Sequence, residues 1–395
     1  MKSMRQLIVK LLLGKNFYNN IANINENIET LTETIINLQE QLKKNRSLII
    51  KAINQSPSVQ EINTKTFAKY RNINKGRDVV IVGSGPTLNY YEPIENVITV
   101  AVNTTLLKVK PDYLFLMDGN VINEDNKELI TKYPCKKFFQ FIGSHRWNLP
   151  VNLREIQDME EYCVDTVEAN TEEGYDSNIY LDICKAPIVS FGSVIYSAAQ
   201  FALWTYPKRI YLVGCDCTNF SEGHFDGTRR LQGNMPFGDT RFVEGWERIK
   251  NFQQIYYPDV EMITINPVGL KGLFNDIFTK RYLQETNSNS AIYLKGYDSD
   301  GWVEKSSRYC ILSGELGELT ISGYYPNEIK PELTGKIILN DEEKSIVITD
   351  NNFKFKFNVK PETVIYINIE MEFEFEVQPP DVRKLCFILT GIDTR

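Results

Sequence analysis

Histidine is the scarcest side chain in this 395-residue chain that could carry proton-transfer chemistry. There are two, His145 and His224, so a metal centre built from several histidines is excluded by their number. His224 lies in a loop between Gly223 and Gly227. An imidazole titrates near neutral pH, which suits a general base for an acceptor hydroxyl or a proton donor to a departing phosphate. We expect His224 to be catalytic, with a solvated loop histidine as the alternative and His145 as a second candidate.

A glycine-rich turn follows an apolar run in the middle of the chain. Residues 78–82 read Asp-Val-Val-Ile-Val, and residues 83–88 read Gly-Ser-Gly-Pro-Thr-Leu. A buried strand that runs into such a turn is typical of nucleotide-binding α/β domains, because glycine lets the backbone approach a ligand closely. The turn lacks the third glycine of a dinucleotide fingerprint and the lysine of a P-loop, which weakens NAD and ATP as ligands. An ordinary strand-to-helix turn is the alternative.

The elements that would position these residues form an α/β pattern. We expect strands at 78–82, 97–102, 113–117, 138–142, 188–191, 209–213 and 262–266, and helices at 194–204 and 246–256. Strands that alternate with helices indicate a mostly parallel sheet covered on both faces. Polar side chains recur where the strands end, at Ser84, Asn103, Asp118, Ser193, Asp216 and Asn266. Ligands of open α/β sheets bind at that edge, so these residues predict one site there.

The order of these motifs resembles the motility accessory factor (Maf) and MptE-like family, and the same architecture is similar to that of the bacterial CMP-sialic-acid-dependent sialyltransferases. The resemblance rests on Asp118 and on segments 83–88, 102–103, 110–113, 191–194, 211–216 and 223–224. It covers roughly residues 77–285 and neither flank.

This resemblance implies a Rossmann-like transferase. It would move a nonulosonic, sialic-type sugar from a CMP-activated donor to a cell-surface glycan, a lipid-linked glycan or a protein. By position it implies that Asp216 orients the nucleotide site, and with His224, which was selected above from its residue type and loop, Asp216 makes up the expected catalytic pair. The implied nucleotide-binding residues are Gly83, Ser84, Gly85, Thr87, Asn103, Asp118, Gly192, Ser193 and Asn219. CMP leaves with a single phosphate, so we expect no metal and no further cofactor.

Two departures from the sialyltransferases bear on the mechanism. Those enzymes place their base histidine where this chain has Pro-Phe-Gly-Asp at 236–239, and they have phosphate-binding tyrosines near where this chain has Phe220 and Phe225. Arg229 and Arg230 could bind the phosphate instead, because guanidinium groups match phosphate oxygens. A surface position is the alternative for both arginines.

The N-terminal segment, residues 1–60, predicts a basic amphipathic helix followed by a coiled coil. Apolar side chains at helical spacing lie among cations in residues 2–13, which is typical of a helix at a membrane surface or of one packed on its own domain. The heptad positions are Ile21, Ile24, Ile28, Leu31, Ile35, Leu38, Leu42 and Ile49. Isoleucine at a and leucine at d favour parallel self-association, with a helix folded back on the domain as the alternative.

The C-terminal segment, residues 288–395, changes to period-two alternation. Residues 353–357 and 365–377 alternate strictly, and short apolar runs at 309–312, 319–321, 337–339 and 346–348 supply further strands. This spacing predicts an all-β sandwich module. Its role is either to support the fold and the oligomer or to bind an acceptor glycan. Residues 61–287 between the two flanks form the predicted transferase domain.

Composition excludes several classes of protein. The formal net charge is −7, so a protein that coats nucleic acid is not expected. The seven cysteines lie far apart, which indicates reduced thiols rather than a disulfide framework. No uninterrupted apolar stretch is long enough to cross a membrane. We expect a cytoplasmic protein whose N-terminal helix is a candidate contact to the inner membrane face. The alternatives are an MptE-like pyrophosphokinase that uses ATP and Mg²⁺, with Asp118 and Asp216 serving the metal, and a non-catalytic glycan-binding scaffold.

Overall fold

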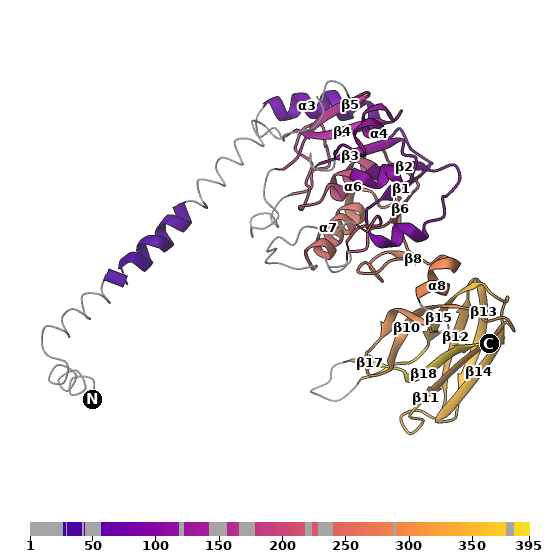
Figure 1. Cartoon of the computed structure of the whole chain (residues 1–395). Coiled ribbons are helices and arrows are strands. Elements are labelled where there is room, and N and C mark those ends of the chain that lie inside the picture. Colours follow the sequence, from indigo (N-terminus) through magenta and orange to yellow (C-terminus); the bar gives the residue numbers. More distant parts are fainter. Residues whose placement is uncertain are drawn as a thin grey trace, which may run out of the picture. The chain divides into compact units, whose positions relative to one another are not determined.

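The computed structural model describes residues 27–28, 30–41, 43, 57–117, 122–141, 156–165, 178–217, 223–227, 240–286, 290–376 and 383–395. The chain divides into two compact units, Met1–Val59 and Gln60–Arg395. The larger unit holds a parallel α/β sheet and a separate antiparallel β module (Figure 1).

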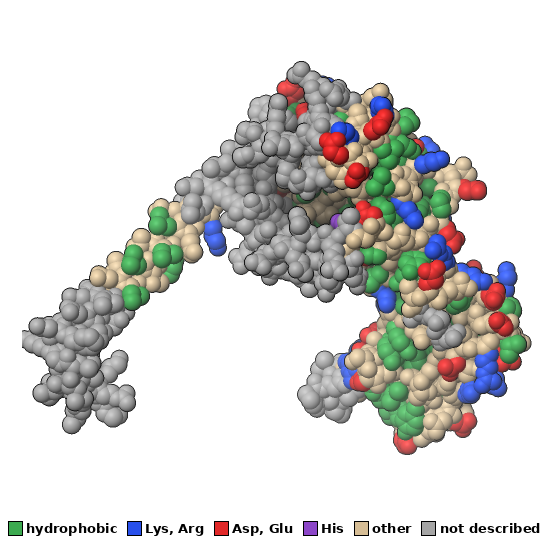
Figure 2. All heavy atoms as spheres, viewed as in Figure 1, with side chains coloured by type: hydrophobic (Ala, Val, Ile, Leu, Met, Phe, Trp, Pro, Cys, Tyr) green, Lys and Arg blue, Asp and Glu red, His purple; other side chains and the backbone are tan. Residues whose placement is uncertain are grey.

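In the smaller unit, the described residues between 27 and 43 are helical. The heptad side chains of Ile28, Leu31, Ile35 and Leu38 are 53–61% exposed, and Figure 2 shows hydrophobic side chains in green on the surface of this segment. The predicted helix is therefore present over these positions. Its pairing with a second helix stays a prediction, and the amphipathic helix predicted at 2–13 lies outside the described residues.

Among the described residues, eight parallel strands form the α/β sheet, in the order β5-β4-β3-β2-β1-β6-β7-β8 (Figure 1). Their bounds are β1 (Asp78–Val82), β2 (Ile98–Val102), β3 (Tyr113–Leu116), β4 (Lys136–Phe141), β5 (Met159–Cys163), β6 (Arg209–Val213), β7 (Glu261–Ile265) and β8 (Asn275–Ile277). The chain builds the sheet outward from β1 in one direction and then, from β6, in the other. Such a reversal is the place where open α/β sheets bind ligands.

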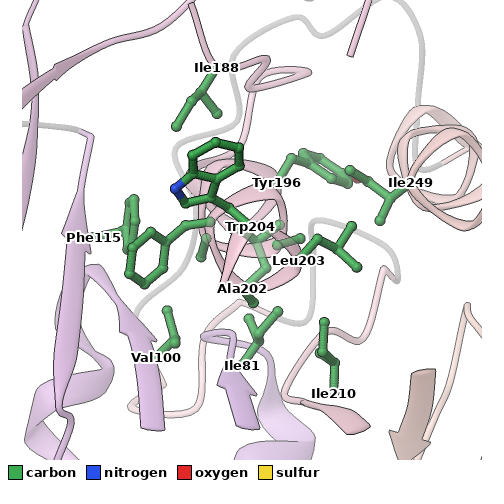
Figure 3. Close-up of a cluster of buried hydrophobic side chains, with 14 of the residues drawn as sticks. Ile81, Val100, Phe115, Ile188, Tyr196, Ala202, Leu203, Trp204, Ile210 and Ile249 are labelled. Carbon is green, nitrogen blue, oxygen red and sulfur yellow. The ribbon is translucent and has the colours of Figure 1, made fainter. Parts of the chain in front are cut away.

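Helix α6 (Val194–Trp204) is the centre of the core, and all eleven of its residues are buried. It packs on β1, β2 and β3. Figure 3 shows Ile81, Val100 and Ile210 of the sheet facing Ala202 and Leu203 of this helix. Burial of these apolar side chains fixes where α6 begins, at the carboxyl edge of the sheet.

The remaining helices frame this core. They are α3 (Pro57–Phe67), η1 (Ala68–Tyr70), η2 (Pro86–Tyr90), η3 (Asn103–Leu107), α4 (Lys127–Lys132), α7 (Thr240–Tyr256) and α8 (Lys280–Thr286). Helix α7 packs against α6 and begins before the predicted start at residue 246. Hydrophobic side chains at 242, 246, 249 and 252 form its buried face.

One predicted strand is wrong. Residues 188–191 do not form a strand: Ile188 makes an isolated bridge to Val164, and a turn begins at Ser190, whose carbonyl accepts from the amide of Ser193. The edge of the sheet is instead β5, which the apolar pattern did not indicate because its sequence is Met-Glu-Glu-Tyr-Cys and its first three residues are half-exposed. An edge strand has a partner on one side only, so it does not need the continuous apolar run of a central strand.

The C-terminal strands form an antiparallel sheet in the order β13-β12-β15-β10-β18-β11-β14, with β9 paired to β10. Their bounds are β9 (Ile292–Tyr297), β10 (Trp302–Leu312), β11 (Glu318–Tyr324), β12 (Leu333–Leu339), β13 (Glu342–Ile348), β14 (Asn352–Asn358), β15 (Val364–Met371) and β18 (Phe387–Thr394). The single strand predicted over 365–377 is divided, because β15 ends at Met371 and β16 (Phe375–Glu376) pairs with β17 (Lys384–Leu385).

No helix in the described part of the chain is both long and apolar enough to span a bilayer.

Candidate active site

A cavity of about 310 Å³ lies at the carboxyl ends of β1, β2, β3 and β6, beside the start of α6. It is lined by eight of the predicted site residues, namely Gly83, Ser84, Gly85, Asn103, Gly192, Ser193, Asp216 and His224. Thr87 lies behind this wall, in contact with Asp216. Asp118 and Asn219 lie outside the described residues. Four of the six polar strand ends, Ser84, Asn103, Ser193 and Asp216, therefore line one cavity. Asn266 does not line it and is hydrogen-bonded to Thr279 instead.

The glycines of the first turn allow two strand ends to approach each other. The amide of Gly83 donates to Val213 O at 2.8 Å, and the amide of Gly85 donates to Gly214 O at 2.8 Å. A Cβ added at Gly83 would lie 2.5 Å from the Gly214 carbonyl oxygen, and Gly214 itself has a φ of +62°. The missing side chains thus make room for the β6 turn. Contact of these glycines with a ligand stays a prediction.

Asp216 holds the glycine turn in place. Its carboxylate accepts hydrogen bonds from the amide of Thr87, at 2.8 Å, and from the Thr87 hydroxyl. Only 6% of Asp216 is exposed, and a Cβ at Gly85 would lie 2.5 Å from its Oδ2 atom. The carboxylate is therefore committed to the turn, so Asp216 acts here as a positioning residue.

The amides that could meet an anion lie mainly at the start of α6. Those of Gly83, Gly85 and Thr87 already donate to the β6 end. Ser193 is the N-cap residue of α6, and its side chain makes no capping hydrogen bond. The next two residues, Val194 and Ile195, line the cavity. First-turn amides have no carbonyl partner within their helix, and the helix dipole places positive charge there.

His224 is held over the glycine turn by its neighbour in the loop. The amide of Phe225 donates to Ser84 O at 2.9 Å, and the Asn89 side chain donates to Phe225 O at 2.8 Å. The Phe225 ring packs on the buried cluster that includes Leu88. These contacts bring the half-buried His224 into the cavity wall, and Figure 2 shows a histidine side chain, in purple, at the surface.

Three aromatic residues of the cavity were not found by sequence reasoning. Tyr196, Phe242 and Trp246 form the wall between α6 and α7. The Tyr196 hydroxyl donates to Phe242 O at 2.6 Å, and the Tyr196 and Trp246 rings are 5.3 Å apart. Gly245 has no side chain because the Tyr196 ring occupies that space. The spacing of positions 242 and 246 on one helix face was the available signal.

Three of the ten described residues other than glycine that have a positive φ lie at or next to this cavity. Asn103, Phe191 and Cys217 have φ values of +50°, +42° and +49°, a region that side chains other than glycine and asparagine rarely occupy. Such conformations are concentrated at ligand sites. The Phe191 ring lies edge-on to Tyr196 at 5.4 Å and beneath the Arg248 guanidinium at 5.6 Å, contacts that hold this turn.

Cys215 of the cavity wall is not an activated nucleophile. All seven cysteines are free thiols. Burial raises the pKa of the Cys215 thiol well above its usual range, whereas a reactive thiol needs a lowered pKa.

The two carboxylates of the Asp-x-Asp sequence at 298–300 are both bound by the guanidinium of Arg383. Arg383 donates to Asp298 at 3.0 Å and to both oxygens of Asp300, at 3.0 and 2.9 Å. The amide of Gly301 donates to Asp298 O at 2.9 Å. These contacts describe a turn of the β module closed by an ion pair. The remaining candidates lie outside the described residues, namely His145, Phe220, Arg229, Arg230 and 236–239.

Comparison with known proteins adds little to this geometry. No protein-family model and no curated protein matches the chain. Among solved structures, an exo-β-1,3-galactanase from Phanerochaete chrysosporium is 12% identical over 27% of this chain and 26% of its own, with a TM-score of 0.18. A family 35 carbohydrate binding module from an environmental isolate is 16% identical over 27% of this chain and 89% of its own, also with a TM-score of 0.18.

A cycloisomaltooligosaccharide glucanotransferase from Paenibacillus sp. is 8% identical over 80% of this chain and 57% of its own, with a TM-score of 0.18. The chain spans about a quarter of the length of the first of these structures, the galactanase. TM-scores at this level transfer neither a fold nor an activity.

Proposed function

We propose that this protein is a Rossmann-like glycosyltransferase that moves an acidic, sialic-type sugar from a CMP-activated donor to a glycan, a lipid-linked glycan or a protein. One observation carries the proposal. A single cavity at the β1/β6 reversal combines the Ser84 turn, the start of α6 and the imidazole of His224. It therefore joins groups suited to an anionic leaving group with a group suited to proton transfer.

The donors in the cavity suit a ligand of low negative charge. Among the described residues that line it, none is a lysine or an arginine, so binding would rest on backbone amides and on the N-terminus of α6. A CMP-sugar carries one phosphodiester charge, which such a site can stabilise. A nucleoside triphosphate carries several charges and ordinarily requires a metal ion or cationic side chains.

In the proposed reaction, His224 accepts the proton of an acceptor hydroxyl as that oxygen attacks the anomeric carbon of the sugar. The new carbon–oxygen bond forms while the bond from the anomeric carbon to the phosphate oxygen breaks. CMP departs with that electron pair, next to the α6 N-terminus. Asp216 takes no proton in this scheme, because its oxygens accept from Thr87 and keep the glycine turn in register.

A nucleotide screen tests the donor class. Thermal unfolding of the full chain would be followed with CMP, CDP, UDP, GDP and ATP, each with and without Mg²⁺. We expect a metal-independent stabilisation by CMP or CDP, because a ligand that binds only the folded state raises the unfolding temperature. A response to ATP with Mg²⁺ and none to CMP would instead identify the pyrophosphokinase, and no response to any nucleotide would identify the scaffold.

A His224→Ala variant tests the catalytic assignment. Turnover should be lost, while CMP affinity should stay within about twofold, because the phosphate is held by α6. Asp226→Asn, an exposed change in the same loop, is the matched control and should retain turnover. Transfer activity in His224→Ala close to that of wild type would remove His224 as the base.

Self-association through the N-terminal helix completes the proposal. Between residues 25 and 41 the positions that flank the apolar seam are uncharged, and two of their threonine hydroxyls bond within the helix. Thr32 donates to Ile28 O at 2.7 Å and Thr34 to Thr30 O at 2.8 Å. No charge on these flanks would repel an identical helix, so a second copy of this chain is the partner that fits. We further propose peripheral contact of the N-terminal residues with the inner membrane face, testable by flotation with anionic vesicles.

A further inference from the structure

Two buried tryptophans of the α/β domain differ in how their indole N–H groups are satisfied. Trp204, which is 4% exposed, donates from Nε1 to Phe67 O at 2.9 Å. Trp246 is 0% exposed, and within the described part of the chain its Nε1 has no hydrogen-bond acceptor. Buried indole N–H groups nearly always have a partner, because water cannot replace a missing one.

The packing around Trp246 keeps its indole where it is. The Tyr196 ring is 5.3 Å away, and the Phe274 ring lies edge-on at 6.1 Å. At the neighbouring Gly245 a side chain would collide with Tyr196. The indole is therefore enclosed by aromatic rings and cannot turn toward a distant acceptor without disturbing α6 and α7.

The position of Trp246 identifies where an acceptor can come from. This residue lines the cavity that also contains Ser84, Ser193 and His224. A cavity of about 310 Å³ is at the lower end of the range for small-molecule sites. Nε1 is covered by its neighbours, so a ligand that supplies the missing acceptor must displace the side chains over it.

The surrounding wall limits the chemistry of that acceptor. Besides Trp246 it includes Tyr196, Phe242 and Met117, which are apolar or aromatic, and no described lining residue is a lysine or arginine. A carboxylate or phosphate placed here would lose its hydration without gaining a counter-charge. A planar ring with a carbonyl oxygen or an unprotonated ring nitrogen suits the wall, since aromatic faces stack on it while the indole donates.

We propose that the indole N–H of Trp246 donates a hydrogen bond to the pyrimidine base of a nucleotide bound in this cavity and so contributes to base recognition. The inference rests on the proposed function in taking the ligand to be a cytidine nucleotide. It goes beyond that function in assigning the base, as distinct from the phosphate, to the α7 wall.

The indole N–H signal of the folded protein gives a direct test. The chain has four tryptophans, so ¹⁵N-indole labelling gives four resonances, and Trp246→Phe and Trp204→Phe identify two of them. CMP and cytidine should move the Trp246 signal downfield, whereas ribose 5-phosphate, which has no base, should leave it in place. If ribose 5-phosphate moves this signal and cytidine does not, the base assignment is wrong.

Binding of CMP by calorimetry provides the second measurement. Trp246→Phe keeps a ring but removes the donor, so we expect affinity to fall roughly three- to tenfold. Trp204→Phe should leave affinity within about twofold but lower the unfolding temperature more, because it leaves the Phe67 carbonyl without its donor. Equal affinities in Trp246→Phe and wild type would overturn the inference.

The two proposals fail in different ways. Wild-type protein that binds CMP without a shift of the Trp246 signal would contradict the role of this tryptophan and leave the transferase proposal standing. Wild-type protein that binds neither CMP nor cytidine would overturn both.

Discussion

Replacement of Asp216 tests how the two strand ends are joined. The carboxylate accepts two hydrogen bonds from Thr87, one from its amide and one from its hydroxyl. Asp216→Ala removes both acceptors and leaves two buried donors facing an empty space. Asp216→Asn keeps one acceptor oxygen, and the Thr87 hydroxyl can turn to accept from the new amide group.

The magnitude follows from these contacts. A hydrogen bond to a charged group contributes about 1.5–3 kcal/mol, so two such bonds set an upper limit of about 6 kcal/mol. Asp216 borders the cavity, and water entering there would replace part of the loss. We therefore expect Asp216→Ala to lower the free energy of unfolding by about 3 kcal/mol, and Asp216→Asn by about half as much. For a unit of this size the larger value corresponds to roughly 6–12 °C in the unfolding temperature.

Urea denaturation of the single and double variants is the appropriate assay. Thr87→Val removes the hydroxyl but keeps the shape and the amide. If the two side chains act through one shared contact, the double variant should cost at least about 1 kcal/mol less than the sum of the single changes. Thr87→Ser, which keeps the hydroxyl, is the matched control. Asp216→Ala with wild-type stability but no CMP binding would show that the carboxylate binds ligand instead of the turn.

Three further predictions concern other parts of the chain. Gly214→Ala should lower the free energy of unfolding by about 3 kcal/mol or more, since it adds a steric clash to a positive φ. Gly76→Ala is the control, because Gly76 also has a positive φ but no atom within 4 Å of the added Cβ, and it should lower the free energy of unfolding by about 1 kcal/mol. Urea denaturation measures both variants. Burial raises the pKa of Asp276, so the folded chain holds this proton more tightly and wild-type stability falls as pH rises through the carboxyl range. The stability of Asp276→Asn relative to wild type should therefore increase from about pH 4 to neutrality. Parallel plots of unfolding free energy against pH for the two proteins would contradict this. Ile35→Asn should lower the mass measured by analytical ultracentrifugation, whereas Ile36→Asn, at an equally exposed position off the seam (54% and 50%), should not; equal effects would refute the coiled coil.

The local sequence predicted secondary structure correctly where its apolar pattern matches the burial of the segment in the folded chain. The predicted strand at 78–82 and the predicted helix at 194–204 match β1 and α6 in full, because both elements are predominantly apolar and all their residues except Asp78 are buried. Residues 188–191 have a similar apolar character but do not form a strand, and the polar Met159–Cys163 forms the edge strand. In these two segments the pairing available in the sheet overrode the local preference.

The residues of the candidate site likewise fall into a group that the sequence predicted and a group that it did not. Residue type and position relative to strand ends were sufficient to select Ser84, Ser193 and His224, which line the cavity. The wall that contains Trp246 was not predicted, because nothing in the local sequence of α7 indicates which of its buried aromatic side chains faces a cavity and which faces the core.

The sequence by itself determined which residues could meet at the sheet edge, because parallel strands bring their carboxyl ends to one side whatever their order. Only the tertiary structure decided what those residues do there. Thr87 and Asp216 are 129 residues apart, and they meet because the chain reverses direction at β1 and places β6 beside it. That neighbour engages the amides of Gly83 and Gly85, so the same two amides that the sequence offered to a ligand instead join β1 to β6.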